Sequence, residues 1–181
     1  MIKFDICDIK FCDDKSGFNL EGLKPLEKRR LGNAAKSIFT VLNGFEICDD
    51  LAFVFSSSQG EFSRCISLLK ELSLDNFVSP TSFSLSVLNS GLATFGIMKK
   101  ANSPIFAISS KFVVRDAFAC AYSKLNEFEK IYVVCYDEVP FKDSFICAGF
   151  MVKKGDGFLI DLDKLKNYEI KDLKKILRTQ L

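Results

Sequence analysis

The turn between an apolar, strand-like run and a helix-like segment holds the side chains best suited to chemistry. It reads Ser109, Ser110 and Lys111, and Phe112 follows it as a further binding candidate. A hydroxyl at a helix start could attack a carbonyl carbon, and backbone N–H groups there could bind the oxyanion that forms. A lysine can serve as base, but adjacent residues at a helix start do not normally face each other. Because serine is a good helix cap, we expect Ser109 or Ser110 to act as a cap.

Two other groups of polar residues give weaker signals. Ser86 and Asn89 lie on an otherwise apolar segment and are candidates for ligand binding, although a polar residue in that setting usually bonds a loop carbonyl. The small residues beside them would allow close packing, either within the chain or across a dimer. Asp137 and Glu138 form a carboxylate pair after a strand, where turn formation and solvation are the common use of acidic residues.

Histidine is absent from the chain, so the commonest general base and a common zinc ligand are missing. The seven cysteines include no CxxC pair, so we predict no metal site, and no cofactor is implied. Five of the seven lie in apolar or strand-like runs, where cysteine behaves as a small hydrophobe. This pattern suits a reducing compartment.

The composition indicates a globular protein of one domain, residues 1–181, since 48% of the residues are hydrophobic. The net charge of +2 gives no footprint for nucleic acid, and the basic clusters at residues 24–30 and 164–178 are mixed with acids, as on solvated helix faces. The amino-terminus does not read as a signal peptide, and no apolar run approaches the ~18 residues of a membrane span. We therefore expect a cytoplasmic protein.

Hydrophobic periodicity predicts strands that alternate with helices. The expected strands cover residues 2–12, 18–20, 51–55, 105–108, 130–136, 145–152 and 158–162. The expected helices cover residues 25–42, 62–72, 83–98, 112–125 and 164–181. A bulge is predicted near Asp8, and Leu69 and Leu72 should face the core. Short buried strands between helices are typical of a layered α/β domain with a mostly parallel central sheet flanked by helices.

Three motifs are specific in combination: SSQGE at residues 57–61, SPTSFSLSVLN at residues 79–89 and YDEVP at residues 136–140. They resemble the "SxxGE", "SPTxFSxSVHN" and "YDExxP" elements of the β-ketoacyl synthase-like amino-terminal domain family, a divergent branch of the thiolase-like condensing enzymes. The resemblance is strongest over residues 24–152. It implies a thiolase-like fold and a place in a fatty-acid- or polyketide-type pathway, such as aryl polyene synthesis.

The same resemblance exposes three departures from an active ketosynthase. Active members place a cysteine at the strand-to-helix turn, where the helix dipole lowers the thiol pKa, but this chain has Ser110 and Lys111 there. Leu88 occupies the position of the histidine in the family's "SVHN". The carboxy-terminal half that supplies the usual catalytic pair is expected to be missing.

These departures predict a pseudoenzyme that binds an acyl chain, an acyl carrier protein or a catalytic ketosynthase. One alternative is an acyl-transfer enzyme that uses Ser110 as its nucleophile. Another is a purely structural homodimer built across the strand at residues 105–108.

Overall fold

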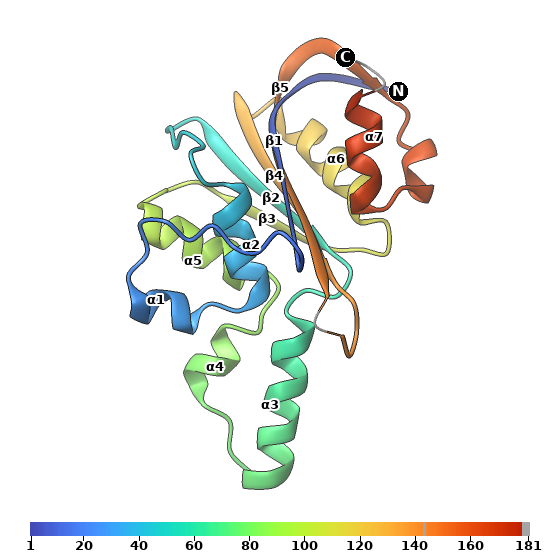
Figure 1. Cartoon of the computed structure of the whole chain (residues 1–181). Helices are drawn as coiled ribbons and strands as arrows, with labels where there is room; N and C mark the ends of the chain where they lie inside the picture. Colours follow the sequence, from blue (N-terminus) through green and yellow to red (C-terminus); the bar gives the residue numbers. More distant parts are fainter. Residues whose placement is uncertain (143, 179–181) are drawn as a thin grey trace.

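A central five-stranded sheet organises the computed structural model, which describes residues 1–142 and 144–178 (Figure 1). The strands, in chain order, are β1 (Ile2–Asp13), β2 (Leu51–Ser57), β3 (Ile105–Ser109), β4 (Lys130–Glu138) and β5 (Phe145–Ile160). Their spatial order is β1-β5-β4-β2-β3. Strand β2 is parallel to β3 and β4, whereas β5 is antiparallel to β4 and β1. Four strands therefore run in one direction and only β5 is reversed, which confirms the predicted α/β fold.

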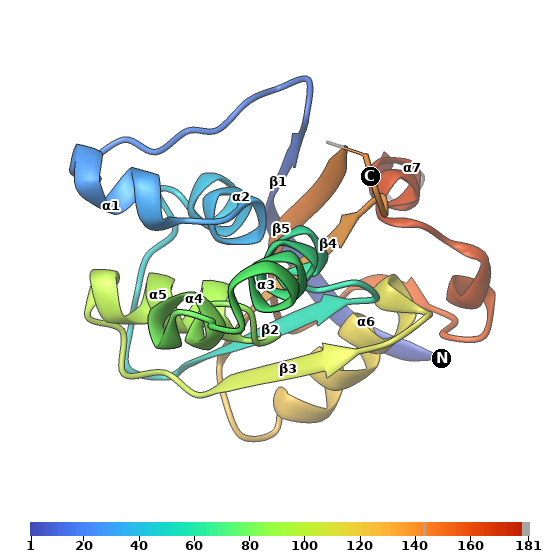
Figure 2. The same cartoon turned by 90° about the horizontal axis from the view of Figure 1, so that it is seen from below.

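Helices cover both faces of the sheet (Figures 1 and 2). On one face lie α2 (Asn33–Val41) and α5 (Ser90–Lys99), preceded by the short α1 (Pro25–Arg30). On the other lie α6 (Val113–Lys124) and the carboxy-terminal elements η1 (Lys164–Asn167), η2 (Ile170–Asp172) and α7 (Leu173–Arg178). The remaining two helices, α3 (Phe62–Asp75) and α4 (Pro80–Ser84), extend away from the sheet.

Strand β2 shows how the sequence builds two cores. All seven of its residues are buried, as predicted for a strand covered on both faces. Because successive side chains point to opposite faces, Phe53 and Phe55 pack toward α2 and α5, and Ala52 and Val54 pack toward α6. The sheet therefore separates two apolar layers, each closed by helices.

The predicted helix over residues 25–42 is wrong in one respect, because it breaks between α1 and α2. Leu31 is buried and has an extended backbone, with a ψ of 132°. The chain turns there to insert this side chain into the core beside α2. The predicted return strand at residues 18–20 is also wrong, since β1 pairs with β5 instead, and Phe18 only stacks on Phe145 at 5.2 Å.

The predicted helix over residues 83–98 is likewise two helices, α4 and α5. The hydroxyl of Ser86 donates to the Phe83 carbonyl at 2.7 Å, and that of Ser90 donates to the Leu85 carbonyl at 2.9 Å. Serine hydroxyls that bond nearby carbonyls compete with the regular helical ladder, and here they stabilise the turn between the two helices.

Helix α3 has the predicted position but not the predicted inner face. Leu69 and Leu72 are exposed by 61% and 47%, and only Leu68 is buried. The helix stands off the sheet (Figure 1), and Leu69, Leu72 and Leu74 remain exposed. A periodic apolar pattern cannot indicate whether a partner surface is within reach.

The carboxy-terminal third differs from the prediction in where its elements begin and end. The two strands predicted at residues 145–152 and 158–162 form one strand, β5. Its partner β1 has a shift of register near Asp8, which confirms the expected bulge. The predicted closing helix over residues 164–181 is replaced by η1, η2 and α7, and its last three residues lie outside the described part of the chain. No helix in the described ranges is long and apolar enough to cross a membrane.

Three buried side chains, Leu165, Ile170 and Leu173, anchor the carboxy-terminal segment beside α6, and Leu173 is fully buried. We predict that Leu173→Ala lowers the free energy of unfolding by about 2–5 kcal/mol, because it removes buried methyl groups and leaves a cavity. Urea denaturation measures the loss. Leu74→Ala at an 80% exposed position is the matched control and should change stability by less than about 0.5 kcal/mol. Equal losses in the two variants would contradict the packing described for this segment.

Candidate functional site

The carboxyl ends of the parallel strands β2, β3 and β4 meet at one edge of the sheet, the usual ligand-binding edge of open α/β sheets. The loop at residues 57–61 lies between the other two strand ends. On one side, the Ser110 N–H donates to the Ser57 carbonyl at 3.1 Å. On the other, the Ser57 hydroxyl donates to Asp137 Oδ1 at 3.2 Å. The candidate turn after β3 is thus coupled to β4 through this loop.

Ser110 is held by hydrogen bonds on both sides of its hydroxyl. The hydroxyl donates to Asp116 Oδ2 and accepts from the Phe112 N–H at 2.9 Å, just before the first residue of α6. Asp116 also pairs with Arg115 Nη1 at 2.6 Å. Lys111 is exposed and makes no hydrogen bond or ion pair within the described residues. The arrangement stabilises the first turn of α6.

The carboxylate of Asp137 binds the loop after β2. Its Oδ1 accepts from the Ser58 N–H at 2.7 Å, the Ser58 hydroxyl at 2.9 Å and the Gln59 N–H at 3.3 Å, besides the Ser57 hydroxyl. Burial raises the pKa of Asp137, and the bonds from Ser58 lower it in part. Four donors on one oxygen fix the loop to the end of β4.

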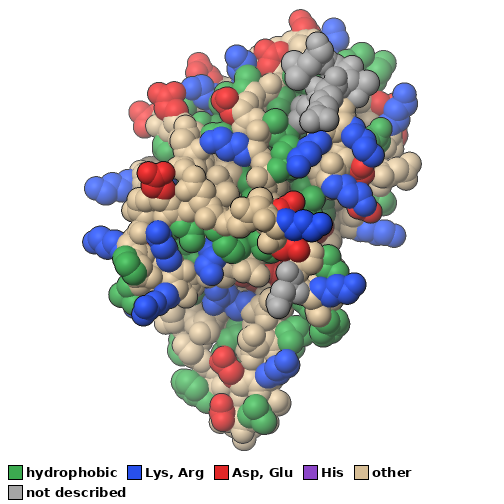
Figure 3. Space-filling model, viewed as in Figure 1, with side chains coloured by type: hydrophobic (Ala, Val, Ile, Leu, Met, Phe, Trp, Pro, Cys, Tyr) green, Lys and Arg blue, Asp and Glu red, His purple; other side chains and the backbone are tan. Residues whose placement is uncertain are grey.

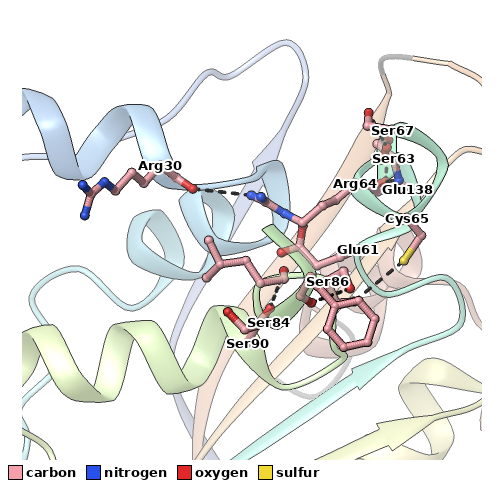
Figure 4. Close-up of polar contacts among 12 residues, drawn as sticks. Arg30, Glu61, Ser63, Arg64, Cys65, Ser67, Ser84, Ser86, Ser90 and Glu138 are labelled. Carbon is pink, nitrogen blue, oxygen red and sulfur yellow. Dashed lines mark hydrogen bonds and ion pairs between the residues drawn. The ribbon is translucent and has the colours of Figure 1, made fainter. Parts of the chain in front are cut away.

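Glu138 follows Asp137 on the strand, so it faces the opposite side of the sheet. It forms a second cluster with residues at the start of α3 (Figure 4). This Glu61–Glu138 cluster comprises Glu61, Ser63, Arg64, Tyr136 and Glu138. Glu138 is only 5% exposed and accepts from the Ser63 N–H at 2.8 Å, the Ser63 hydroxyl at 2.6 Å and the Tyr136 hydroxyl at 2.6 Å. Burial raises the pKa of Tyr136, so its hydroxyl stays protonated and donates.

Glu61 is the carboxylic acid of this cluster whose pKa is raised. It is 5% exposed, and Arg64 Nε lies 3.6 Å from its carboxylate. Burial raises the pKa of Glu61 to about 7, while Arg64 lowers it and Glu138 raises it. Arg64 also donates to the Arg30 carbonyl at 3.4 Å, which links the start of α3 to the end of α1 (Figure 4). One buried carboxyl with a pKa raised to about 7 therefore lies where the start of α3 meets the end of α1.

Two small clefts flank these clusters. One of about 270 Å³ is lined by Gly32, Glu61, Arg64 and Glu138 among others, and one of about 230 Å³ by Lys111, Asp137, Tyr168 and Lys171 among others. Both are smaller than the usual ~300–1,000 Å³ of ligand pockets. Their linings mix carboxylates with cations, which suits polar groups better than a long apolar chain. No group of three or more Cys, Asp or Glu side chains in residues 1–142 and 144–178 is placed to hold a metal ion.

The α4–α5 segment holds the binding candidates Ser86 and Asn89, and its Gly91 packs against α2. Ser86 bonds the Phe83 carbonyl, and Asn89 is exposed, with no side-chain hydrogen bond to any described residue, so the expected bond to a loop carbonyl is not formed. A side chain added at Gly91 would come within 2.7 Å of Ile38 Cδ1 on α2. The small residue is therefore needed for the close approach of α5 to α2 within the chain.

Leu88 stands beside the loop after β2. A side chain added at Gly60, whose φ is +59°, would meet Leu88 Cδ1 at 3.1 Å. Leu88 also packs against the core on the α2 side of the sheet. The position that resembles the family histidine thus holds an apolar side chain, which packs against the loop after β2 at Gly60.

Sequence reasoning missed that the two strand-end carboxylates are shielded from solvent, Glu138 buried and Asp137 half-buried. Asp137 and Glu138 were expected in a solvated turn, but they are the last residues of β4 and bind the neighbouring loop and helix. The signal that could have located them is positional. Parallel strands β2 and β4 end side by side, so the SSQGE and YDE motifs must meet at the same edge.

The sequence profile described as the β-ketoacyl synthase N-terminal domain matches residues 8–144. This chain belongs to that family. The predicted resemblance is therefore confirmed, and the layered arrangement around β2 and β4 is the family's thiolase-like fold. No curated protein matches the chain.

Solved structures show the same fold. A ketosynthase (ApeO) in complex with its chain length factor (ApeC) from Xenorhabdus doucetiae matches with a TM-score of 0.71 and 18% identity, over 87% of this chain and 81% of that chain. The ishigamide ketosynthase/chain length factor matches with a TM-score of 0.59 and 12% identity, over 77% of this chain and 48% of that chain. A β-ketoacyl synthase from Burkholderia phymatum STM815 matches with a TM-score of 0.58 and 11% identity, over 77% of this chain and 46% of that chain. The chain thus spans about half the length of the last two.

The raised pKa of Glu61 predicts a pH-dependent stability. Between pH 4.5 and about 7 the unfolded carboxyl is ionised while the folded one keeps its proton, so stability falls as the pH rises through this window. At ~1.4 kcal/mol per pKa unit, the loss is up to roughly 3 kcal/mol. Glu61→Gln should remove it, so the variant gains stability relative to the parent between pH 5 and pH 8. Urea denaturation at the two pH values measures the difference.

Glu71→Gln on the same helix is the control, because Glu71 is exposed. It should keep the pH dependence of the parent protein. An unchanged pH dependence in Glu61→Gln would show that Glu61 does not titrate near neutral pH in the folded protein.

Proposed function

We propose that this chain is a non-condensing, chain length factor-like subunit that pairs with a catalytic ketosynthase. The observation that carries the proposal is the state of the strand-to-helix turn. Where active relatives place a cysteine, Ser110 has its hydroxyl bonded to Asp116 and Phe112. The chain also has no histidine to act as base, and Leu88 fills the position of the family histidine. In this proposal the fold is retained, and the turn stabilises the start of α6 instead of supplying a nucleophile.

The structural comparisons support a ketosynthase as partner. By its description, the structure from Xenorhabdus doucetiae contains a ketosynthase together with a chain length factor. The matched chain in that complex is of similar length to this one, since the match covers 87% of one and 81% of the other. Such a pairing would place this chain in a fatty-acid- or polyketide-type pathway, with aryl polyene synthesis as one candidate.

Strand β3 offers the surface for such a pairing. Among the described strands it pairs only with β2, so its outer edge presents free backbone groups. The carbonyl of Pro104 accepts from β2 and the N–H of Ser110 donates to β2. The backbone N–H and C=O groups of the even-numbered residues of β3 therefore point toward β2. The N–H of Ala107 therefore points outward, toward an added strand. The alternative is that a second copy of this chain pairs with the same edge and forms a homodimer.

A proline at residue 107 tests this surface, because it removes the outward donor and leaves the bonds to β2 intact. We expect the chain to co-elute with candidate ketosynthases from the same genome in size-exclusion chromatography, and Ala107→Pro to lose the complex. Ala107→Val is the control and should keep it, and circular dichroism melting checks that both variants fold. Failure of the parent chain to bind any ketosynthase would overturn the proposed function. Undiminished binding by Ala107→Pro would overturn the edge as its site.

An acyl carrier protein is a second candidate partner. Exposed basic side chains gather on α1 and at the end of α5 (Figure 3). They are Lys24, Arg29, Arg30, Lys99 and Lys100. No ion pair neutralises them within the described part of the chain. An acidic carrier would be attracted to this surface, and its co-elution, weakened by salt, tests the idea in the same column experiment.

The alternative function is acyl transfer through Ser110, and the contact with Asp116 favours it, because a carboxylate could accept the hydroxyl proton. The proposed function predicts no covalent adduct when the chain is incubated with acyl-CoA and its intact mass is measured. A mass gain of one acyl group that is lost in Ser110→Ala and kept in Ser109→Ala would overturn the non-catalytic proposal. Ser109 is a matched control, since it is an exposed neighbour on the same turn.

A further inference from the structure

We propose that Cys12 and Cys147 form a reversible disulfide, which makes the pairing of β1 with β5 a redox-responsive site. The two residues are direct partners in the antiparallel register of these strands. Both are free thiols in the structure. The inference does not depend on the proposed function.

The geometry of the strand pair meets the requirements of a disulfide. Opposite residues on antiparallel strands have Cα atoms about 4.5–5.5 Å apart, and disulfides span about 4.4–6.8 Å. Both side chains belong to the apolar cluster on the α2 side of the sheet, so they point to the same face. The register therefore places the two sulfur atoms on the same face at neighbouring positions of paired strands.

The other cysteines lack such a partner. Cys135 is on the neighbouring strand β4, but it packs in the opposite core layer, on the α6 side. Cys7 on β1 faces Met151 on β5. The strand registers place no other two cysteines of the described chain opposite each other. The site is therefore specific to one pair of the seven.

Oxidised glutathione can supply the chemistry by two exchange steps. The Cys12 thiolate attacks one glutathione sulfur, which forms a mixed disulfide and releases the first glutathione thiolate. The Cys147 thiolate then attacks Cys12 Sγ and releases the second glutathione thiolate, so the protein loses two hydrogens and one oxidised glutathione becomes two reduced molecules. Burial raises the pKa of both thiols, which makes the reaction slow. Cys12 reacts first because it adjoins the exposed turn at residues 14–17.

The bond would fasten the amino-terminal strand to the sheet. In the reduced protein the Cys12 thiol donates to the Gly17 carbonyl at 3.3 Å, and Phe18 stacks on Phe145 beside it. A covalent link at this point holds the segment between β1 and α1 at its base. Because it joins residues far apart in the sequence, it also restricts the unfolded chain, so the oxidised protein should melt at a higher temperature than the reduced one.

The test uses the full chain incubated for a day with oxidised glutathione below its melting temperature, then alkylated and digested without reductant. Peptide mass mapping should identify a Cys12–Cys147 cross-link with the loss of two hydrogens, reversed by dithiothreitol. The melting temperature of the cross-linked protein should rise by several degrees and return on reduction. Cross-links confined to other cysteines, glutathione adducts alone, or no cross-link would each overturn the proposal.

Two variants isolate the pair. Cys147→Ala should abolish the cross-link and the rise in melting temperature, whereas Cys135→Ala, equally buried on the next strand, should keep both. The mapping of the parent protein decides the outcome even where a core variant folds poorly. Loss of the cross-link in Cys135→Ala as well as in Cys147→Ala would contradict a pair formed by Cys12 and Cys147 alone.

Discussion

The end of β4 is the constraint on which the functional edge depends. Two successive carboxylates point to opposite faces of the sheet, because side chains alternate along a strand. Asp137 takes four hydrogen bonds from the loop after β2, and Glu138 takes three from Ser63 and Tyr136. A buried carboxylate is costly unless its oxygens are bonded, so the loop and the start of α3 are held where these donors meet the acids. The turn after β3 is joined to the same loop through Ser110.

This constraint explains how a ketosynthase fold persists with a changed site. The strand-to-helix turn of α6 keeps its position through backbone bonds, and the hydroxyl of Ser110 completes the first turn of the helix. Leu88 packs against the loop in place of a base. The side chains at this edge, Ser110, Asp137 and Leu88, therefore stabilise the arrangement of the loop and the turn.

Much of the fold could be predicted from local patterns. The buried strands β2 and β4 and the helix α6 follow from continuous apolar runs and turn residues, and the bulge in β1 follows from a break in alternation near Asp8. The failures share a physical cause. The break at Leu31, the exposed face of α3 and the broken carboxy-terminal helix are set by which surfaces lie within reach, and periodicity alone carries no information about distant surfaces.

For the site, the sequence by itself determined the types of residue at the strand-to-helix turn and the absence of histidine, since these depend only on chemical identity. The motifs also determined the family. Only the tertiary structure decided that Glu138 is buried and Asp137 half-buried, that Glu61 lies beside Arg64 with a pKa near 7, and that Cys12 faces Cys147. Each of these depends on strand register and burial, which bring together residues that lie far apart in the chain.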